Sequence, residues 1–111
     1  MSEGGATDHS FGLRRLIPGT HGGYATSVVV DGADRILVGG RAFEDSDYAS
    51  SDWIVSRILP GGATDPSWSG GFARIDFGTG EDQVNDLVLQ RGKPVAAGSI
   101  YGSLGVARFE P

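Results

Sequence analysis

The chain has 111 residues, no cysteine, 19 glycines and a formal net charge of −5. It lacks the run of about 18 apolar residues that a transmembrane helix needs, and without cysteine it can form neither a disulfide framework nor a cysteine-based zinc site. Its acidic balance argues against a nucleic-acid partner, because phosphate contacts need clustered Lys and Arg. We therefore expect neither a membrane nor a nucleic acid among its partners.

The first half of the chain predicts four short β-strands. Segments rich in Val, Ile and Leu and bounded by Gly and Asp are typical of strands, and they lie at residues 13–17, 24–30, 35–42 and 53–59. Helical spacing of apolar residues is missing throughout the chain. The tight turn at Asp31-Gly32 joins two of these segments, so we expect an antiparallel meander.

The second half repeats the first. Gly4-Gly5-Ala6-Thr7-Asp8 recurs letter for letter as Gly61-Gly62-Ala63-Thr64-Asp65, and further blocks match in the same order. Strands are expected at residues 72–77, 84–90, 93–100 and 104–109. Self-similarity at a fixed period indicates a repeat architecture, so the sequence predicts a duplication with units at 1–60 and 61–111.

The second copy also resembles a known family. The run Asp82–Gly98, with Asp65–Trp68 before it and Val106–Phe109 after it, resembles the delta-60 repeat of bacterial β-propeller proteins. The resemblance implies an all-β fold with two four-stranded antiparallel propeller blades per chain. It implies no particular activity, because the repeat and not a reaction defines that family.

Two blades cannot close a ring, because propellers have about four to eight. Repeat units cannot bury their apolar faces alone, so either other copies complete the circle or the chain is an excerpt of a longer protein. The presence of two whole repeats favours head-to-tail assembly. We expect a homotrimer with six blades rather than a homotetramer with eight, acting as a non-catalytic binding or scaffolding unit.

The linker motif at the start of each repeat gives the expected interface. Asp8, Ser10 and Phe11 are predicted to pack on an adjacent copy as Asp65–Trp68 pack on the first blade of their own chain. Repeated positions most simply reflect repeated packing needs. We therefore place Asp8, Ser10 and Phe11 in an interface between copies.

Each linker aspartate has an arginine counterpart on the last strand of a repeat. Arg57 and Arg108 occupy equivalent places there, as Asp8 and Asp65 do in the linkers. Arginine suits bidentate pairing with a carboxylate. A structural ion pair between linker and strand is favoured over a ligand-binding arginine.

A lectin-like carbohydrate binder is the alternative function. Aromatic side chains favour binding sites for flat ligands, and Trp53 aligns with the non-aromatic Leu104 after a loop of unequal length. Trp53 and Tyr48 are therefore the candidate residues for a glycan or small-molecule ligand at a blade junction. Phe11 and Trp68 are equivalent to each other and are interpreted as packing wedges.

The loop before Trp53 is acidic, with Glu44, Asp45, Asp47 and Asp52. Carboxylate oxygens suit Ca²⁺, but the spacing lacks the glycine and terminal glutamate of an EF-hand. A solvated loop is favoured, so no metal or other cofactor is predicted.

No catalytic constellation is visible in the sequence. His9 and His21 are the only histidines, and no Gly-x-Ser-x-Gly elbow accompanies them, so the chain is not expected to be an enzyme. Its first residues have neither the basic start nor the apolar stretch of a secretory signal. A cytoplasmic protein and an excerpt of a secreted one both fit this pattern.

Overall fold

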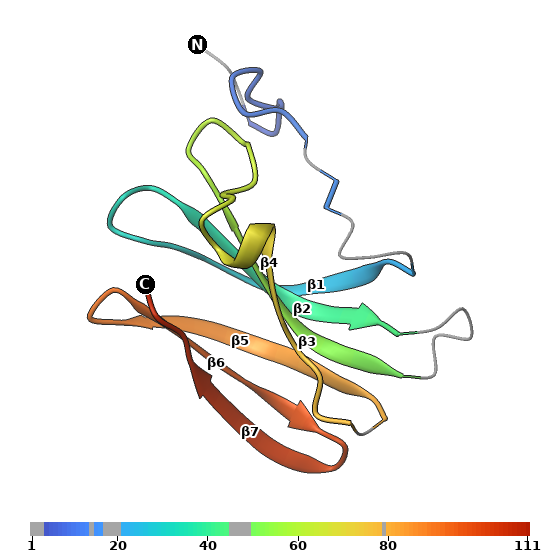
Figure 1. Ribbon diagram of the computed structural model, residues 1–111. Coiled ribbons are helices and arrows are strands. Elements are labelled where there is room, and N and C mark those ends of the chain that lie inside the picture. The colour runs from blue at the N-terminus through green and yellow to red at the C-terminus, as the bar shows by residue number, and fades with distance from the viewer. Residues whose placement is uncertain (1–3, 14, 17–20, 45–49, 79) are drawn as a thin grey trace.

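A computed structural model of the chain describes residues 4–13, 15, 16, 21–44, 50–78 and 80–111. These residues form two antiparallel β-sheets and one short 3-10 turn, η1 (Ser69–Gly71) (Figure 1). Sheet A has, in spatial order, β1 (Gly23–Val30), β2 (Ile36–Phe43), β3 (Ser51–Ile58) and β4 (Phe72–Ile75). Sheet B has β5 (Asp82–Gln90), β6 (Lys93–Ile100) and β7 (Ser103–Arg108). The all-β expectation is confirmed.

Two of the expected strands behave differently from the prediction. The expectation that residues 72–77 open the second sheet is wrong, because β4 pairs with β3 and completes sheet A. Leu13, Arg15 and Leu16, from the strand expected at 13–17, are not in a strand, and the other two residues of that segment lie outside the described residues. The six remaining strands appear within two residues of their expected bounds.

The two sheets have corresponding strand pairings. Each also has an irregularity in its first strand, between Ala25 and Ser27 in β1 and between Val84 and Asp86 in β5. A bulge at the same place makes the two first strands bend alike. Corresponding pairs are Val28–Val38 and Leu87–Ala96, and Gly39–Val55 and Ala97–Val106.

The core lies between the sheets. A Cβ atom on Gly39 would stand 2.9 Å from Cγ1 of Val84, so the absence of a side chain there lets β5 pack closely on β2. The buried cluster consists of Leu37, Trp53, Val55, Trp68, Val84, Leu87 and Ala96.

Each sheet therefore has one face in this core and one facing away from it. We call the faces in the core the packed faces and the other two the open faces. The open face of sheet B carries Val88, Leu104 and Val106, all exposed, and that of sheet A carries Val28 and Val30, also exposed. β7 is the outer edge strand of sheet B, and the N-terminal residues extend beyond the sheets (Figure 1).

In the part of the chain that the structure describes, no helix has the length and apolar character needed to cross a membrane.

Candidate functional site

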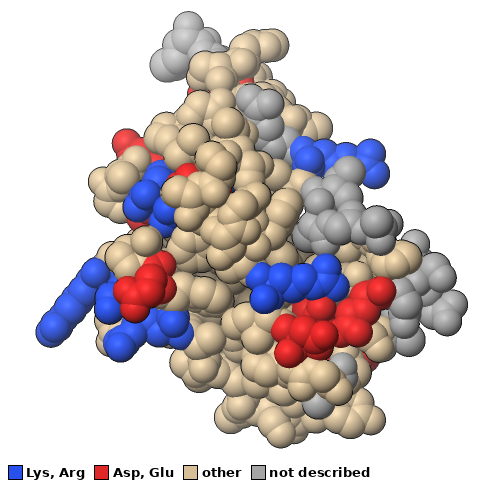
Figure 2. Space-filling model, viewed as in Figure 1, with Lys and Arg blue, Asp and Glu red and all other residues tan. Residues whose placement is uncertain are grey.

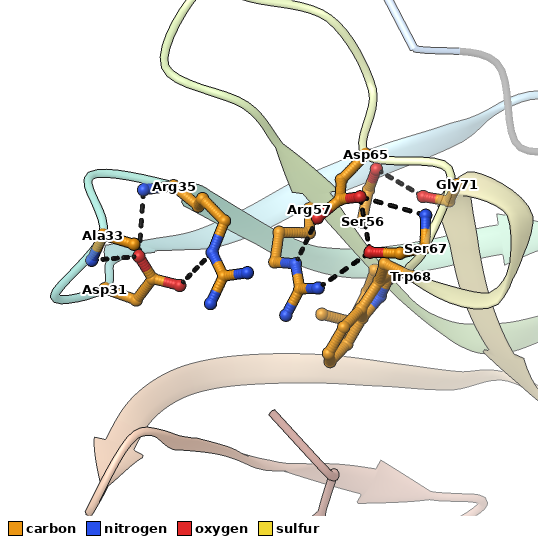
Figure 3. A network of polar contacts seen from close by, with 10 residues as sticks. Asp31, Ala33, Arg35, Ser56, Arg57, Asp65, Ser67, Trp68 and Gly71 are labelled. Carbon is orange, nitrogen blue, oxygen red and sulfur yellow. Dashed lines mark hydrogen bonds and ion pairs between the residues drawn. The ribbon is translucent and has the colours of Figure 1, made fainter.

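The linker between β3 and β4 is fixed to β3 by a buried ion pair. Nε of Arg57, on β3, lies 2.9 Å from Oδ2 of Asp65, and both side chains are at least nine-tenths buried. Figure 3 shows the two side chains pointing toward each other, with Ser67 beside them. The guanidinium of Arg57 also lies over the ring of Trp68, 4.7 Å from its centroid. The predicted pairing of linker and strand is confirmed for this copy.

The linker itself is held in a tight turn that presents Asp65. Oδ1 of Asp65 accepts hydrogen bonds from the amide of Ser67 at 3.0 Å and from its hydroxyl at 2.7 Å. These two bonds, followed by the bond and charge of Arg57, hold the pKa of Asp65 below its ordinary value. The indole Nε1 of Trp68 donates to the carbonyl of Val55 at 2.9 Å. The turn is therefore tied to β3 at two points.

The N-terminal segment has the same turn, and no described strand pairs with it. Oδ1 of Asp8 accepts from the amide of Ser10 at 2.9 Å and from its hydroxyl at 2.8 Å, and the hydroxyl bond is the main cause of a lowered pKa at Asp8. Gly5 and Gly62, at equivalent positions, share a φ of 98°. Residues 4–10 are all exposed. The N-terminal turn is therefore preformed for a contact like that of Asp65.

The arginine equivalent to Arg57 is exposed in the single chain. Arg108, on β7, donates from Nη1 to the side-chain carbonyl of Gln90 at 2.9 Å. Among the described residues the ion-paired carboxylates belong to Asp31, Asp52, Asp65 and Glu110, and Asp8 is not one of them. The structure thus brings Arg57 and Asp65 together but leaves Asp8 and Arg108 apart.

A groove separates the N-terminal segment from the open face of sheet A. Its volume is about 390 Å³. Phe11, Leu13 and Leu16 line one side of it, and Val38, Ile54 and Ile58 of sheet A line the other. Most of these side chains are apolar, so the groove suits another apolar surface. Sequence reasoning placed Leu13 and Leu16 in an expected strand at 13–17 but did not connect them with a groove on sheet A.

The residues proposed for ligand binding are placed differently. Trp53 is only 1% exposed, its Nε1 donates to the carbonyl of Ser99 at 3.0 Å, and its ring meets Phe77 edge-on. In this position the indole belongs to the core and presents no face to a ligand. Tyr48 lies outside the described residues. His9 is exposed and His21 is half-buried.

Three carboxylates, two of them from the acidic loop, meet beside sheet A. One oxygen each from Glu44, Asp52 and Asp76 lies within 4.8 Å of the others, and Nε of Arg74 contacts Oδ2 of Asp52 at 2.7 Å. A hydrogen bond to Asp52 is the largest cause that raises the pKa of Glu44 to about 7. Asp45 and Asp47 lie outside the described residues, and Asp76 was not expected here because it follows β4.

Charged side chains form separate groups on the face drawn in Figure 2, with uncharged surface between them. Opposite charges stand beside each other in these groups, as they do in the pair formed by Arg74 and Asp52. On this face the charged groups among the described residues form no continuous basic surface.

Comparisons with protein-family models, curated proteins and solved structures found no match.

Proposed function

We propose that this chain is a two-bladed propeller module that assembles head-to-tail with copies of itself into a closed ring. Each sheet is one blade of the delta-60 type. The sequence units span residues 1–60 and 61–111, and the second unit supplies β4 as the fourth strand of the first blade. The ring acts as a non-catalytic binding or scaffolding unit. The support comes from the two open faces and from the exposed N-terminal turn at Asp8 and Ser10.

The observation that carries this proposal is that positions buried between the sheets have exposed equivalents on the open face of the other sheet. Val55, on the packed face of sheet A, is 0% exposed, whereas its equivalent Val106 on sheet B is 75% exposed. Trp53 is 1% exposed, and its equivalent Leu104 is 96% exposed. The open face of sheet B is thus the counterpart of a face that is already packed against a sheet within the chain.

The same relationship holds in the other direction. Leu87 and Ala96, on the packed face of sheet B, are buried, and their equivalents Val28 and Val38 lie on the open face of sheet A. Sheet A of one copy can therefore receive sheet B of another as sheet B receives sheet A within the chain. Such a contact is heterologous, and it closes into a ring when its rotation is a simple fraction of a turn.

Apolar burial supplies the driving force. Covering an exposed Val or Leu side chain contributes about 1.5–3 kcal/mol, and at least five such side chains stand on the open faces: Val28, Val30, Val88, Leu104 and Val106. Each chain adds two blades, so the ring has an even number. We favour three chains and six blades over four chains and eight.

The mass in solution tests this proposal. Light scattering after size exclusion at tens of micromolar should give three or four times the chain mass of 11.5 kDa. Val106→Asp should return the mass to that of one chain, with an unchanged circular dichroism spectrum, because a charge on the open face of sheet B cannot be buried unpaired.

Tyr101→Asp is the matched control, since Tyr101 is also exposed but lies in the turn between β6 and β7. The Tyr101→Asp variant should keep the mass of the assembled ring of chains. A parent chain that stays single and folded, or a Val106→Asp variant that keeps the ring mass, would contradict the proposal.

A further inference from the structure

The last strand of sheet A comes from the far side of the linker. After the turn at Asp65, the chain reaches β4, which pairs antiparallel with β3, with Ile75 opposite Trp53 and Phe72 opposite Ser56. Sheet B has no such strand among the described residues: β7 pairs with β6 only (Figure 1). The other edge of β7 therefore keeps a row of unpaired N–H and C=O groups.

A segment near the start of the chain corresponds to β4 in sequence. In sequence, Leu13 aligns with Phe72, Arg15 with Arg74 and Leu16 with Ile75, at the constant offset that also relates β1 to β5. Leu13 is 91% exposed, and neither it nor Leu16 belongs to a strand.

We propose that the segment containing Leu13, Arg15 and Leu16 of one copy adds as the fourth strand to β7 of the neighbouring copy. This inference rests on the proposed ring and specifies how its copies are joined. The pairing of β3 with β4 sets the register: Leu16 stands opposite Leu104, and Leu13 stands opposite Ala107 of the neighbour. The occupant of the free edge of β7 is thus a second copy of this chain.

The preformed N-terminal turn fits the same neighbour. The connection from Asp8 to Leu13 is two residues shorter than that from Asp65 to Phe72, which includes η1. In this register we place Asp8 against Arg108 of the neighbour, as Asp65 lies against Arg57 within the chain. Phe11 then lies over that guanidinium as Trp68 lies over Arg57. The exposed carboxylate and the exposed guanidinium become a buried pair, which is the charge complementarity that fixes register.

The groove beside the segment gives independent support. Within the chain, β3 has the linker and β4 on one side. Sheet B lies on its other side. In the proposed contact, β7 of the neighbour would run between the N-terminal segment and sheet A of this copy. The groove of about 390 Å³ that Phe11, Leu13 and Leu16 line together with sheet A lies in that place.

Disulfide trapping tests the register directly, because the chain has no cysteine of its own. The variants Leu16→Cys and Leu104→Cys are made in separate chains, one of them ¹⁵N-labelled, then mixed and oxidised. Opposed residues on paired strands have Cα atoms about 4.5–5.5 Å apart, within disulfide reach. Mass spectrometry should find a bond between labelled and unlabelled chains.

Leu13→Cys mixed with Leu104→Cys is the control. In the proposed register those positions lie about three residues apart along the strand, on the order of 10 Å, which is too far for a disulfide. The yield of the 16–104 bond should exceed that of the 13–104 bond at least tenfold.

Arg108→Gln is a second variant that spares the fold, since Arg108 is exposed in the single chain. It should raise the dissociation constant of the assembly at least tenfold, while Arg91→Gln, with the same loss of charge in the turn between β5 and β6, should not.

The outcomes separate this inference from the proposed function. A ring of the expected mass without an excess of the 16–104 bond, or one unaffected by Arg108→Gln, would overturn strand donation and leave the ring standing. A chain that stays single would overturn both.

Discussion

Arg57 and Asp65 form an ion pair at 2.9 Å in which each side chain is at least nine-tenths buried. Asp65 also accepts two hydrogen bonds from Ser67, and the Arg57 guanidinium lies against the ring of Trp68. Ser67 and Arg57 thus stabilise the negative charge of Asp65, and Asp65 and the ring of Trp68 stabilise the positive charge of Arg57. The pair joins β3 to the linker that leads into β4. It therefore fixes the position of the linker from which β4 begins.

Removing the arginine should destabilise the fold strongly. Arg57→Met keeps most of the side-chain volume but leaves the Asp65 carboxylate buried and unpaired, which costs about 3–5 kcal/mol in the free energy of unfolding. Urea unfolding at one fixed protein concentration measures the change. Lys93→Met is the control: Lys93 and Glu110 stand 3.8 Å apart with exposed side chains, and such a pair contributes about 0–1 kcal/mol. Equal losses for the two variants would contradict this role of the buried pair.

The Asp65 carboxylate should contribute to the loss of the free energy of unfolding at acid pH. Because the pKa of Asp65 is lowered in the folded chain, its ionised form stabilises the fold above the ordinary pKa of 3.8, and this contribution is lost as the pH falls below that value. Urea midpoints between pH 7 and pH 2 should fall less steeply for Asp65→Asn than for the parent. Asp34→Asn, at an exposed turn position, should follow the parent curve.

The strands and the ion pair could be predicted from the sequence for different reasons. Strands such as β1 and β6 follow from local runs of apolar residues between turn residues, which need no knowledge of the partner strand. The pairing of Arg57 with Asp65 could be inferred from the duplication, since each repeat carries an equivalent arginine and an equivalent aspartate. Both inferences use information that lies in the order of residues along the chain.

The neighbour of β4 could not be predicted in this way. The pattern of Phe72–Ile75 indicates a strand, but it reads the same whether that strand pairs with β3 or with β5. Trp53 is a similar case: its aligned partner is Leu104, so it looked variable. Its burial depends on Gly105, where a Cβ atom would stand 3.0 Å from the Trp53 ring. Contacts between distant segments decide both cases.

The packing of the sheets should depend on a missing side chain at Gly39. A Cβ atom there would lie 2.9 Å from Val84 and 3.1 Å from Leu87, so Gly39→Ala must push β5 away from β2. Such overpacking costs about 1–3 kcal/mol, measurable by urea unfolding. Gly32→Ala is matched in chemistry but meets nothing within 4 Å, and it should leave the midpoint unchanged or raise it slightly. A neutral Gly39→Ala would show that the interface between the sheets is loosely packed.

The carboxylates of Glu44, Asp52 and Asp76 should give a second, separate pH dependence. A hydrogen bond to Asp52 and the nearby negative charges raise the pKa of Glu44 to about 7. The protonated Glu44 can donate to Oδ1 of Asp52, a buried atom that no other donor in the described part of the chain reaches. A raised pKa means that this contribution is complete below 4.5 and is lost as the pH rises through about 7.

Glu44→Gln replaces that proton with a permanent amide donor. The parent should therefore unfold at a lower temperature at pH 8 than at pH 5, whereas the midpoint of the variant should change much less between these pH values. Glu110→Gln removes the same charge at an exposed position and should behave like the parent. Asp65 titrates well below this range, so the two carboxylates act in different pH windows. If Glu44→Gln and the parent lose stability equally from pH 5 to pH 8, the hydrogen bond from protonated Glu44 to Asp52 does not stabilise the fold.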